Sequence, residues 1–477
     1  MINSLHDAIA LLEGAEELVR ITVPVDTCRE LPMVVRRISA RPDGGKALLF
    51  EQPLGHQMPV VANLFGSTER MRLLLGLEQL EQLRERFETL LDRLPDYDLE
   101  QLGQRLDYLL RQDGFRPQMV EAAPCRELVD DAPDLLALPF HQNWPDDGSV
   151  AGTGRYITMG QIHTTAPDGS DQNCGIYRCQ IHGPQTLAIR WRPGSGAARH
   201  HRQYCDLKQR MPVAISLGGP PALTLAAAWP LPDGLDELTF AGWLAGSPLP
   251  VVSCSHAPLA VPAGAELVLE GFAEPDQQLM EGPFGNHTGG YDPAGVAAKV
   301  TITRITRRRN PLLPITVVGP PPQEDCWMML GWERLLAALL PRLVPGVVAI
   351  GMPLPWVFRQ SAVIALDRAR VDDLNILSQR LRQLPWFRSA RLLLFVDQTT
   401  APHDPLAVAW QSVNLADWNQ HLLPGDDPLQ LAVDATGWHR PGPSLADPLT
   451  SDLVSRRWAE YGLNDYIALK WDWYKGV

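Results

Sequence analysis

Leucines spaced three and four residues apart mark one amphipathic helix in the first quarter of the chain. These apolar positions are Leu77, Leu80, Leu83, Phe87, Leu90 and Leu94. Glu, Gln and Arg separate them and Pro95 follows, so we predict a helix that ends at this proline. Two short β-rich runs, residues 18–25 and 59–64, precede the helix. Residues 1–125 are therefore predicted to form an N-terminal α+β domain.

The central part of the chain changes to many short strand-like runs between Gly, Pro, Asp and Asn. Residues 265–272 and 298–305 alternate apolar with polar side chains, which is the period of a half-buried strand. Residues 126–310 are therefore predicted to form a β-barrel or a β-sandwich.

Apolar strands alternate with helical segments in the last third of the chain. The run 392–396 is a strand candidate, and residues 332–343 and 371–384 have a helical pattern. We therefore predict an α/β domain over residues 311–440. A proline-rich segment, 437–448, then links it to a C-terminal helical extension, 441–477, with its helix near 450–461.

Composition limits the class of protein. The 477 residues are 45% hydrophobic and 20% charged, with a formal net charge of −13. The acidic balance argues against an extended nucleic-acid surface, and the short run Arg307 to Arg309 is typical of a solvated strand end. The longest uncharged stretch, residues 343–358, contains three prolines, which argues against a transmembrane helix.

Cysteine usage and the first residues indicate a compartment. Seven cysteines form no CxxC pair and leave an odd one over, so reduced thiols are expected. The chain starts without a basic region followed by an apolar core, and we expect no secretory signal. Both observations favour a cytoplasmic protein.

Residues 281–290, with the sequence EGPFGNHTGG, form the most informative segment of the chain. Pro283 fixes φ, and four glycines permit backbone angles that other residues resist, so a shaped loop is more consistent with this segment than a helix. Such a loop suits a ligand, although a surface turn has a similar composition. Its first residue, Glu281, is a candidate general base, ion-pair partner or exposed turn acid.

A second segment, residues 173–178, changes the interpretation of Glu281. It reads NCGIYR, so Asn173 and Arg178 lie five positions apart beside a glycine. An ion pair between Arg178 and Glu281 would join the two segments into one site.

These segments together resemble the UbiD family of decarboxylases, which use prenylated flavin mononucleotide. The matching motifs run through most of the chain in one order: residues 17–26, 123–125, 173–178, 215–218, 240–242, 268–271, 281–290 and 434–436. The resemblance implies an α+β multidomain fold, with a central split β-barrel of flavin-reductase type between an N-terminal α+β segment and a C-terminal α/β domain.

The resemblance also implies a reaction. Such enzymes carry out reversible non-oxidative decarboxylation of an aromatic or α,β-unsaturated carboxylic acid. The modified flavin adds to the substrate, accepts the electrons released with carbon dioxide and frees the product after protonation. The protein would place the carboxylate over the flavin and deliver one proton.

Site residues follow from the resemblance by position. Arg178 matches the residue that faces the substrate carboxylate, and Glu281 matches the acid that pairs with it. Asn173 and Glu237 match two ligands of a divalent metal, usually manganese, that bridges the cofactor phosphate. The implied cofactor-binding residues are Asn173, Gly175, Ile176, Tyr177, Arg178, Arg190 and Glu237, with a potassium ion as a further cofactor.

The loop departs from the family pattern at its second acid. Asn286 stands where Glu or Asp is usual, and an amide cannot shuttle a proton near neutral pH. We therefore expect altered proton delivery at Asn286. His287 is a candidate proton carrier or a structural hydrogen-bond partner, and Gly290 replaces an aromatic residue, with Tyr291 next.

The chain also departs from the family pattern at the position of the third metal ligand. Gly194 stands at the position of the usual histidine, and it has no side chain to offer. His200 and His201 lie six and seven residues further on and are candidates to replace it, although adjacent histidines are also common on surfaces. His182, in the turn before a strand, is a poorer candidate.

Two classes of function therefore remain open. One is an active decarboxylase, a carboxy-lyase that depends on a flavin prenyltransferase for its cofactor. The other is a divergent homologue that keeps the fold, lacks ordinary decarboxylation, and acts as a cofactor-binding or assembly protein. In either case the resemblance implies a homo-oligomer, a dimer or hexamer. The acidic balance and the prolines in the uncharged stretch separately favour a protein without a nucleic-acid partner or a transmembrane segment.

Overall fold

The computed structural model describes residues 2–94, 98–256, 258–356, 361–425, 427–437 and 447–462. The chain divides into two compact units, residues 1–332 and 333–477, and each is considered by itself. The predicted linker lies mostly outside the described residues, as do the ends of the predicted C-terminal extension. The four-part division at 125, 310 and 440 stays a prediction.

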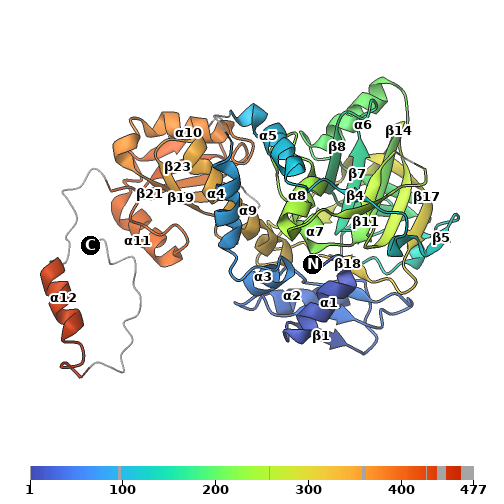
Figure 1. The fold of residues 1–477 in the computed structure, drawn as a ribbon, viewed down its shortest axis with the longest axis horizontal. Helices are drawn as coiled ribbons and strands as arrows, with labels where there is room; N and C mark the ends of the chain where they lie inside the picture. The colour runs from blue at the N-terminus through green and yellow to red at the C-terminus, as the bar shows by residue number, and fades with distance from the viewer. Residues whose placement is uncertain are drawn as a thin grey trace. The chain divides into compact units, whose positions relative to one another are not determined.

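The N-terminal part of the first unit is a four-stranded sheet with helices (Figure 1). The sheet has the order β1-β2-β3-β18, so β18 pairs with β3 although it follows the predicted boundary at residue 310. The strands are β1 (Leu18–Ile21), β2 (Ala47–Phe50), β3 (Val60–Ala62) and β18 (Leu313–Ile315). The helices are α1 (Leu5–Gly14), α2 (Glu30–Ser39), α3 (Thr68–Leu74), α4 (Gln82–Leu91) and α5 (Leu99–Gln112).

Helix α4 corresponds to the predicted amphipathic helix but is shorter. Leu83, Phe87, Leu90 and Leu91 are buried on one face, as the spacing predicts. Leu77 and Leu80 are also buried, but they precede the helix in turn and loop backbone. Apolar spacing therefore identified the buried positions and placed the start of the helix five residues too early.

A nine-stranded sheet forms the centre of the first unit. Its order is β6-β9-β10-β17-β14-β11-β7-β8, and β5 also pairs with β17. Its strands are β5 (Leu128–Asp130), β6 (Tyr156–Ile157), β7 (Gly160–Thr165), β8 (Gln172–Ile176), β9 (Cys179–Gly183), β10 (Thr186–Ile189), β11 (Met211–Gly218), β14 (Ala265–Glu281) and β17 (Gly295–Arg307). Both predicted strands lie inside the long antiparallel pair β14 and β17.

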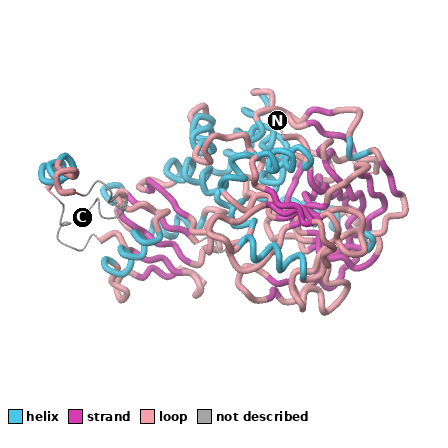
Figure 2. Tube along the Cα trace, turned by 90° about the horizontal axis from the view of Figure 1, so that it is seen from below, coloured by secondary structure: helices cyan, strands magenta, loops and turns pink. Residues whose placement is uncertain are grey.

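Smaller elements complete this part of the chain. A three-stranded sheet contains β4 (Gln118–Met119), β12 (Pro250–Ser253) and β13 (Ala260–Pro262), and a hairpin contains β15 (Phe284–Gly285) and β16 (Tyr291–Asp292). The helices are α6 (Gly196–Asp206), α7 (Pro221–Ala228) and α8 (Glu237–Ala245), with short 3-10 turns η1 (Pro124–Arg126) and η2 (Leu135–Ala137). Figure 2 distinguishes these elements by colour, with strands in magenta and helices in cyan.

One hydrophobic core joins the four-stranded and the nine-stranded sheets of the first unit. Leu48 and Phe50 of the N-terminal sheet belong to the same buried cluster as Ile215, Leu269 and Ile302 of the large sheet. Burial of this shared apolar surface is the main stabilising contribution for both sheets. The N-terminal segment and the large sheet therefore form one packed body.

The second unit is an α/β arrangement, as predicted for this part of the chain. Its sheet has the order β19-β20-β21-β23-β22, with parallel pairing of β21 to β20 and to β23. The elements are α9 (Glu324–Leu343), which begins in the first unit, β19 (Val347–Gly351), β20 (Ala362–Leu366), η4 (Arg368–Arg370), α10 (Leu374–Gln383), β21 (Leu392–Asp397), α11 (Pro405–Leu415), β22 (Leu422–Pro424), β23 (Leu431–Asp434) and α12 (Pro448–Arg456). Among the described helices, none has the length and apolar character needed to cross a membrane.

Candidate functional site

The loop after β14 is a hairpin with a buried base and an exposed tip, Thr288 to Tyr291. Glu281 is the last residue of β14, pairs with Gly295 of β17 and is fully buried. Gly282 follows with φ +94°, a backbone angle that favours glycine. At Gly285 a Cβ atom would lie 2.2 Å from the Trp144 ring. The glycines therefore meet local steric requirements and hold Glu281 at the end of its strand.

Arg178 and Glu281 form a two-pronged ion pair. Arg178 Nε and Nη2 donate to the two carboxylate oxygens of Glu281, at 2.8 Å and 3.1 Å. The guanidinium also lies over the Phe284 ring, 4.6 Å from its centroid. Because its plane is fixed by the carboxylate and the ring, Arg178 presents its remaining edge in a defined direction.

Arg190 from the end of β10 is a second cation beside Glu281. Its Nη2 lies 2.9 Å from Glu281 Oε2 and donates to the Glu281 carbonyl oxygen at 3.0 Å. Glu281 therefore lies between two guanidiniums as a buried ion-pair partner. Of the three roles open for Glu281, the geometry favours this one.

A hollow of about 390 Å³ lies beside the ion pair. Its walls are Ile176, Tyr177, Arg178, Arg190, Trp191, Arg192, Pro193, Asp292 and Pro293. Within the described part of the chain, the buried Arg190 Nε and Trp191 Nε1 atoms have no hydrogen-bond partner. Aromatic rings, cations and unmet donors together suit a planar anionic ligand.

Asn286 is built into the turn of the hairpin. Its Oδ1 accepts hydrogen bonds from the Thr288 backbone N–H at 2.9 Å and from the Thr288 hydroxyl at 2.7 Å. Its Nδ2 donates to Asp292 Oδ1 at 2.6 Å. His287 leaves the loop in another direction, with Nε2 located 2.7 Å from Asp325 Oδ2. The pairing with Asp325 makes His287 part of a separate contact between the loop and α9.

Asp292 is the site residue that sequence analysis missed. Its Oδ2 accepts from Arg178 Nη1 at 2.8 Å, on the edge of the guanidinium that Glu281 leaves open. Asp292 lies six residues after Asn286 and reaches Arg178 because β16 folds back against β15. The turn-forming residues Thr288 to Gly290 were the available signal, because a hairpin there brings residue 292 back toward residue 284.

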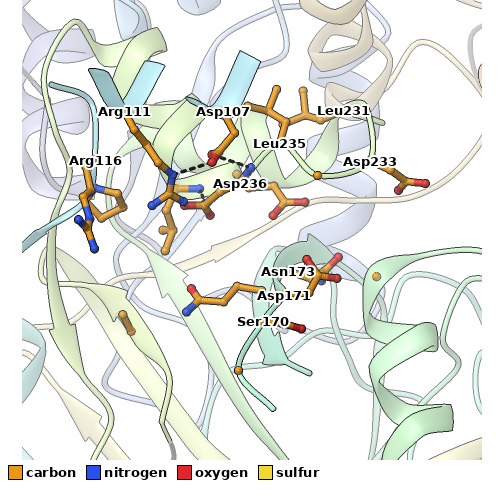
Figure 3. A pocket seen from close by; sticks show the side chains of 18 of the residues that line it. Asp107, Arg111, Arg116, Ser170, Asp171, Asn173, Leu231, Asp233, Leu235 and Asp236 are labelled. Carbon is orange, nitrogen blue, oxygen red and sulfur yellow. Dashed lines mark hydrogen bonds and ion pairs between the residues drawn. The ribbon is translucent and has the colours of Figure 1, made fainter. Parts of the chain in front are cut away.

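A second hollow, of about 480 Å³, lies at the other end of β8 (Figure 3). Asn173 and Glu237 both line it, and Glu237 Oε2 accepts a hydrogen bond from the Cys174 backbone N–H at 3.0 Å. Figure 3 also shows Arg111 bridging Asp107 and Asp236 on one side of this hollow, with Ser170, Asp171 and Asn173 on the other. Ser195 caps α6 and Asp236 caps α8, which fixes both helices around it.

The Asn173 amide and the Glu237 carboxylate are incompletely paired within the described structure. In the described structure, the buried Asn173 Nδ2 atom has no hydrogen-bond partner. Desolvation by burial raises the pKa of Glu237 to about 8, because hydrogen bonds from the backbone N–H groups of Cys174 and Glu237 do not outweigh it and the charge of Asp236 adds to it. The unmet Nδ2 donor suits an acceptor such as a phosphate oxygen, whereas Asn173 Oδ1 and the Glu237 carboxylate are the oxygens that a hard divalent cation would use.

The histidine candidates for a third metal ligand are otherwise engaged. His200 is buried, with Nδ1 located 2.9 Å from the Thr164 hydroxyl and Nε2 located 3.1 Å from Asp171. His201 packs against Trp191, with ring centroids 5.9 Å apart, and burial lowers its pKa. His182 lies against Gly152 and does not line the hollow with Asn173. Among the described residues, no three His, Cys, Asp or Glu side chains gather as metal ligands.

Gly194 has open space around it but a restrictive backbone. No heavy atom lies within 4 Å of the position that its Cβ would take. Its φ of +81° is in the left-handed region, where a side chain is strained. The chain therefore offers two of the three implied metal ligands, and the position of the third is a glycine suited to its turn.

Comparisons with known proteins agree with this architecture. Three models of 3-octaprenyl-4-hydroxybenzoate carboxy-lyase match in order: the N-terminal domain over residues 9–90, the Rift-related domain over 118–321 and the C-terminal domain over 326–437. An uncharacterised protein of Archaeoglobus fulgidus is 34% identical over 412 residues, which is 86% of this chain and 83% of the relative. One from Aquifex aeolicus is 33% identical over 91% of this chain and 89% of the relative.

Solved structures give the same result. Vanillic acid decarboxylase of Sedimentibacter hydroxybenzoicus in closed form has a TM-score of 0.84 at 24% identity, over 97% of this chain and all of that chain. The UbiD-class enzyme HmfF of Pelotomaculum thermopropionicum, in an evolved dimeric form with bound prenylated FMN, has a TM-score of 0.77 at 25% identity, over 96% and 100%. The mixed α/β multidomain fold is that of UbiD-class enzymes, and the chain belongs to the UbiD family of carboxy-lyases.

Proposed function

We propose that this protein is a reversible, non-oxidative decarboxylase of an aromatic or α,β-unsaturated carboxylic acid, with prenylated FMN as cofactor. The single observation that carries the proposal is Arg178, clamped by the buried Glu281 with one edge turned to a hollow walled by Tyr177 and Trp191. A guanidinium fixed in this way can bind a substrate carboxylate through parallel hydrogen bonds.

The residues around the two hollows suit the proposed cofactor. Arg190 Nε and Trp191 Nε1 are donors without partners among the described residues, and Gly175, Ile176 and Tyr177 carry the chain from one hollow to the other. Asn173 and Glu237 would hold Mn²⁺ or another divalent cation next to the cofactor phosphate, with K⁺ as a further ion. When bound, the modified flavin would supply the electron sink for the carbon–carbon bond cleavage.

This chain's own groups would orient the acid and exclude water. Arg178 would hold the substrate carboxylate, and Glu281 would fix the orientation of the guanidinium plane. Arg190 would balance the buried negative charge of Glu281. The remaining task is to deliver a proton to the carbon that loses its carboxyl group. Asn286 cannot perform it, so proton delivery differs from the usual family pattern.

The wider proposal follows from family membership. The nine-stranded sheet would act as the flavin-binding split barrel, a flavin prenyltransferase would supply the cofactor, and the protein would work as a homo-oligomer in the cytoplasm. Production of the protein together with a flavin prenyltransferase tests the central claim. The absorption spectrum and the mass of the released cofactor should identify prenylated FMN.

The loaded protein should then release carbon dioxide from some members of a panel of cinnamic, hydroxybenzoic and heteroaromatic acids. It should also exchange the corresponding hydrogen of the product in heavy water. The second candidate function, a homologue without ordinary decarboxylase activity, is favoured by the glycine at position 194. Flavin binding without turnover or exchange would support that candidate, and absence of bound flavin would contradict the enzyme proposal.

A further inference from the structure

The carboxylate of Asp292 occupies the edge of Arg178 that faces the hollow, although no acid is present at position 286 of the loop. We propose that Asp292 replaces the missing second acid: it holds Arg178 until a substrate carboxylate arrives, and it then carries the proton that replaces the departing carboxyl group. This inference rests on the proposed function and adds its proton donor.

The geometry indicates that a ligand can displace Asp292 from Arg178 more readily than it can displace Glu281. Glu281 is fully buried and grips two nitrogens of Arg178, whereas the Asp292 side chain is 41% exposed and contacts only Nη1. Asp292 also lines the hollow directly. A substrate carboxylate entering the hollow therefore competes with Asp292, and not with Glu281, for the guanidinium.

Asn286 fits the role of a positioning residue for Asp292. Its Nδ2 holds Asp292 Oδ1 at 2.6 Å, which leaves Oδ2 to face Arg178. Thr288 fixes the other end of the Asn286 amide through two hydrogen bonds. The amide at position 286 therefore orients an acid six residues later.

The charges around Asp292 make it sensitive to an incoming anion. Desolvation pushes the pKa of Asp292 up, but the hydrogen bond and charge of Arg178, together with Asn286 and Arg190, outweigh it and hold the pKa below its usual range. The facing groups are Arg178 after β8, Arg190 after β10 and, across these two cations, Glu281 of β14. Arg192 lines the same hollow.

Substrate binding reverses this balance. When a substrate carboxylate takes Arg178 Nη1, Asp292 loses its cation and gains a negative neighbour, and both changes favour its protonated form. One proton is then taken from solvent. The carbon–carbon bond to the carboxyl group breaks, carbon dioxide leaves, and the electron pair left at carbon forms a C–H bond with the Asp292 proton. Asp292 is again an anion and returns to Arg178.

Benzoate binding to the protein as produced tests the linkage without turnover. Calorimetry in buffers of different ionisation enthalpy should show uptake of about one proton per benzoate bound at neutral pH. Asp292→Asn should bind benzoate at least roughly tenfold more tightly, because a competitor for Arg178 is gone, and should take up no proton. Equal proton uptake by the two proteins, or no benzoate binding by either, would overturn the proposal.

Turnover by the flavin-loaded protein provides the second test. Asp292→Asn should lower turnover and hydrogen exchange in heavy water roughly 100-fold, and Asp292→Glu should restore part of both. The matched control exchanges the two positions: Asn286→Asp combined with Asp292→Asn keeps one acid and one amide, and should recover turnover. Full activity of Asp292→Asn would refute Asp292 as donor while leaving the decarboxylase intact. No turnover by any variant, with Asp292-dependent proton uptake retained, would count only against the proposed function.

Discussion

The two polar clusters at opposite ends of β8 differ in how far the protein alone satisfies them. Arg178, Glu281, Asp292 and Arg190 form a closed set in which each carboxylate faces a guanidinium, although the Arg190 Nε donor has no partner among the described residues. Asn173 and Glu237 form an open set, with a buried amide donor unmet within the described structure and a carboxylate whose pKa burial raises to about 8. The ion pairs of the first cluster form within the protein, whereas the second cluster keeps groups that a ligand would satisfy.

This difference indicates which step each cluster serves. Glu281 already fixes the plane of the Arg178 guanidinium, so a substrate carboxylate has only to displace Asp292, and this preorganisation would favour binding in the reactive orientation. If the open cluster holds the cation proposed for it, metal binding and cofactor loading would be coupled, because Asn173 and Glu237 alone leave the site incomplete. The closed cluster should therefore control stability and turnover, while the open cluster should control metal content.

Breaking the closed cluster should have the largest effect. Glu281→Gln leaves Arg178 and Arg190 facing each other without the buried carboxylate, and we expect a loss of about 3 kcal/mol in the free energy of unfolding, measured with urea. The matched control is Glu88→Gln, which removes a surface pair with Arg84 on α4 and should cost about 0.5 kcal/mol. Similar costs for the two variants would contradict the central role of Glu281.

The open cluster should respond in metal content. Glu237→Gln removes the only carboxylate that pairs with Asn173 in this proposal, and we expect manganese affinity to fall at least roughly tenfold. Metal analysis after dialysis measures this. The control is Asp233→Asn, since Asp233 lines the same hollow but is an exposed loop residue. Equal metal loss in both variants would point to a diffuse acidic surface.

Sequence patterns were most informative where local chemistry determines structure. The alternating runs 265–272 and 298–305 lie in paired strands, and the glycines and proline of residues 281–290 do form a tight hairpin. A pair between Arg178 and Glu281 was expected, and the two side chains are joined. Their catalytic roles stay a prediction, as do those of Asn286, His287 and the cofactor-binding residues.

Contacts set by register were beyond the sequence. Asp292 reaches Arg178 only because β16 pairs with β15 in one particular register, with Asp292 opposite Phe284. His200 was a candidate ligand by spacing, yet α6 turns it toward Thr164 and Asp171. Spacing along the chain reports which residues are near in sequence, whereas these contacts depend on how separate elements pack.

Asp147, which holds the hairpin of the closed cluster through the Gly285 backbone N–H, gives a pH-dependent prediction. Asp147 accepts hydrogen bonds from the backbone N–H of Gly285 and of Trp144, yet desolvation by burial raises its pKa to about 6. Because the folded pKa lies above the unfolded value near 3.8, its contribution to stability is present below pH 3.8 and is lost as pH rises through 6. Relative to Asp147→Asn, the natural protein should lose about 2 kcal/mol of unfolding free energy between pH 4 and pH 7. Parallel pH profiles of the two proteins would contradict this account.

Restoring a histidine at position 194 should have the smallest effect on stability and would sharpen the contrast between the clusters. The space around Gly194 is open, but its φ of +81° should make Gly194→His cost about 1 kcal/mol of unfolding free energy. If the third ligand of the open cluster belongs there, manganese affinity should rise despite this cost, because the imidazole adds to Asn173 and Glu237. Gly194→Asn carries similar backbone strain without an imidazole and serves as the control. Equal metal content in the two variants would show that the open cluster takes its remaining ligands from elsewhere than this turn.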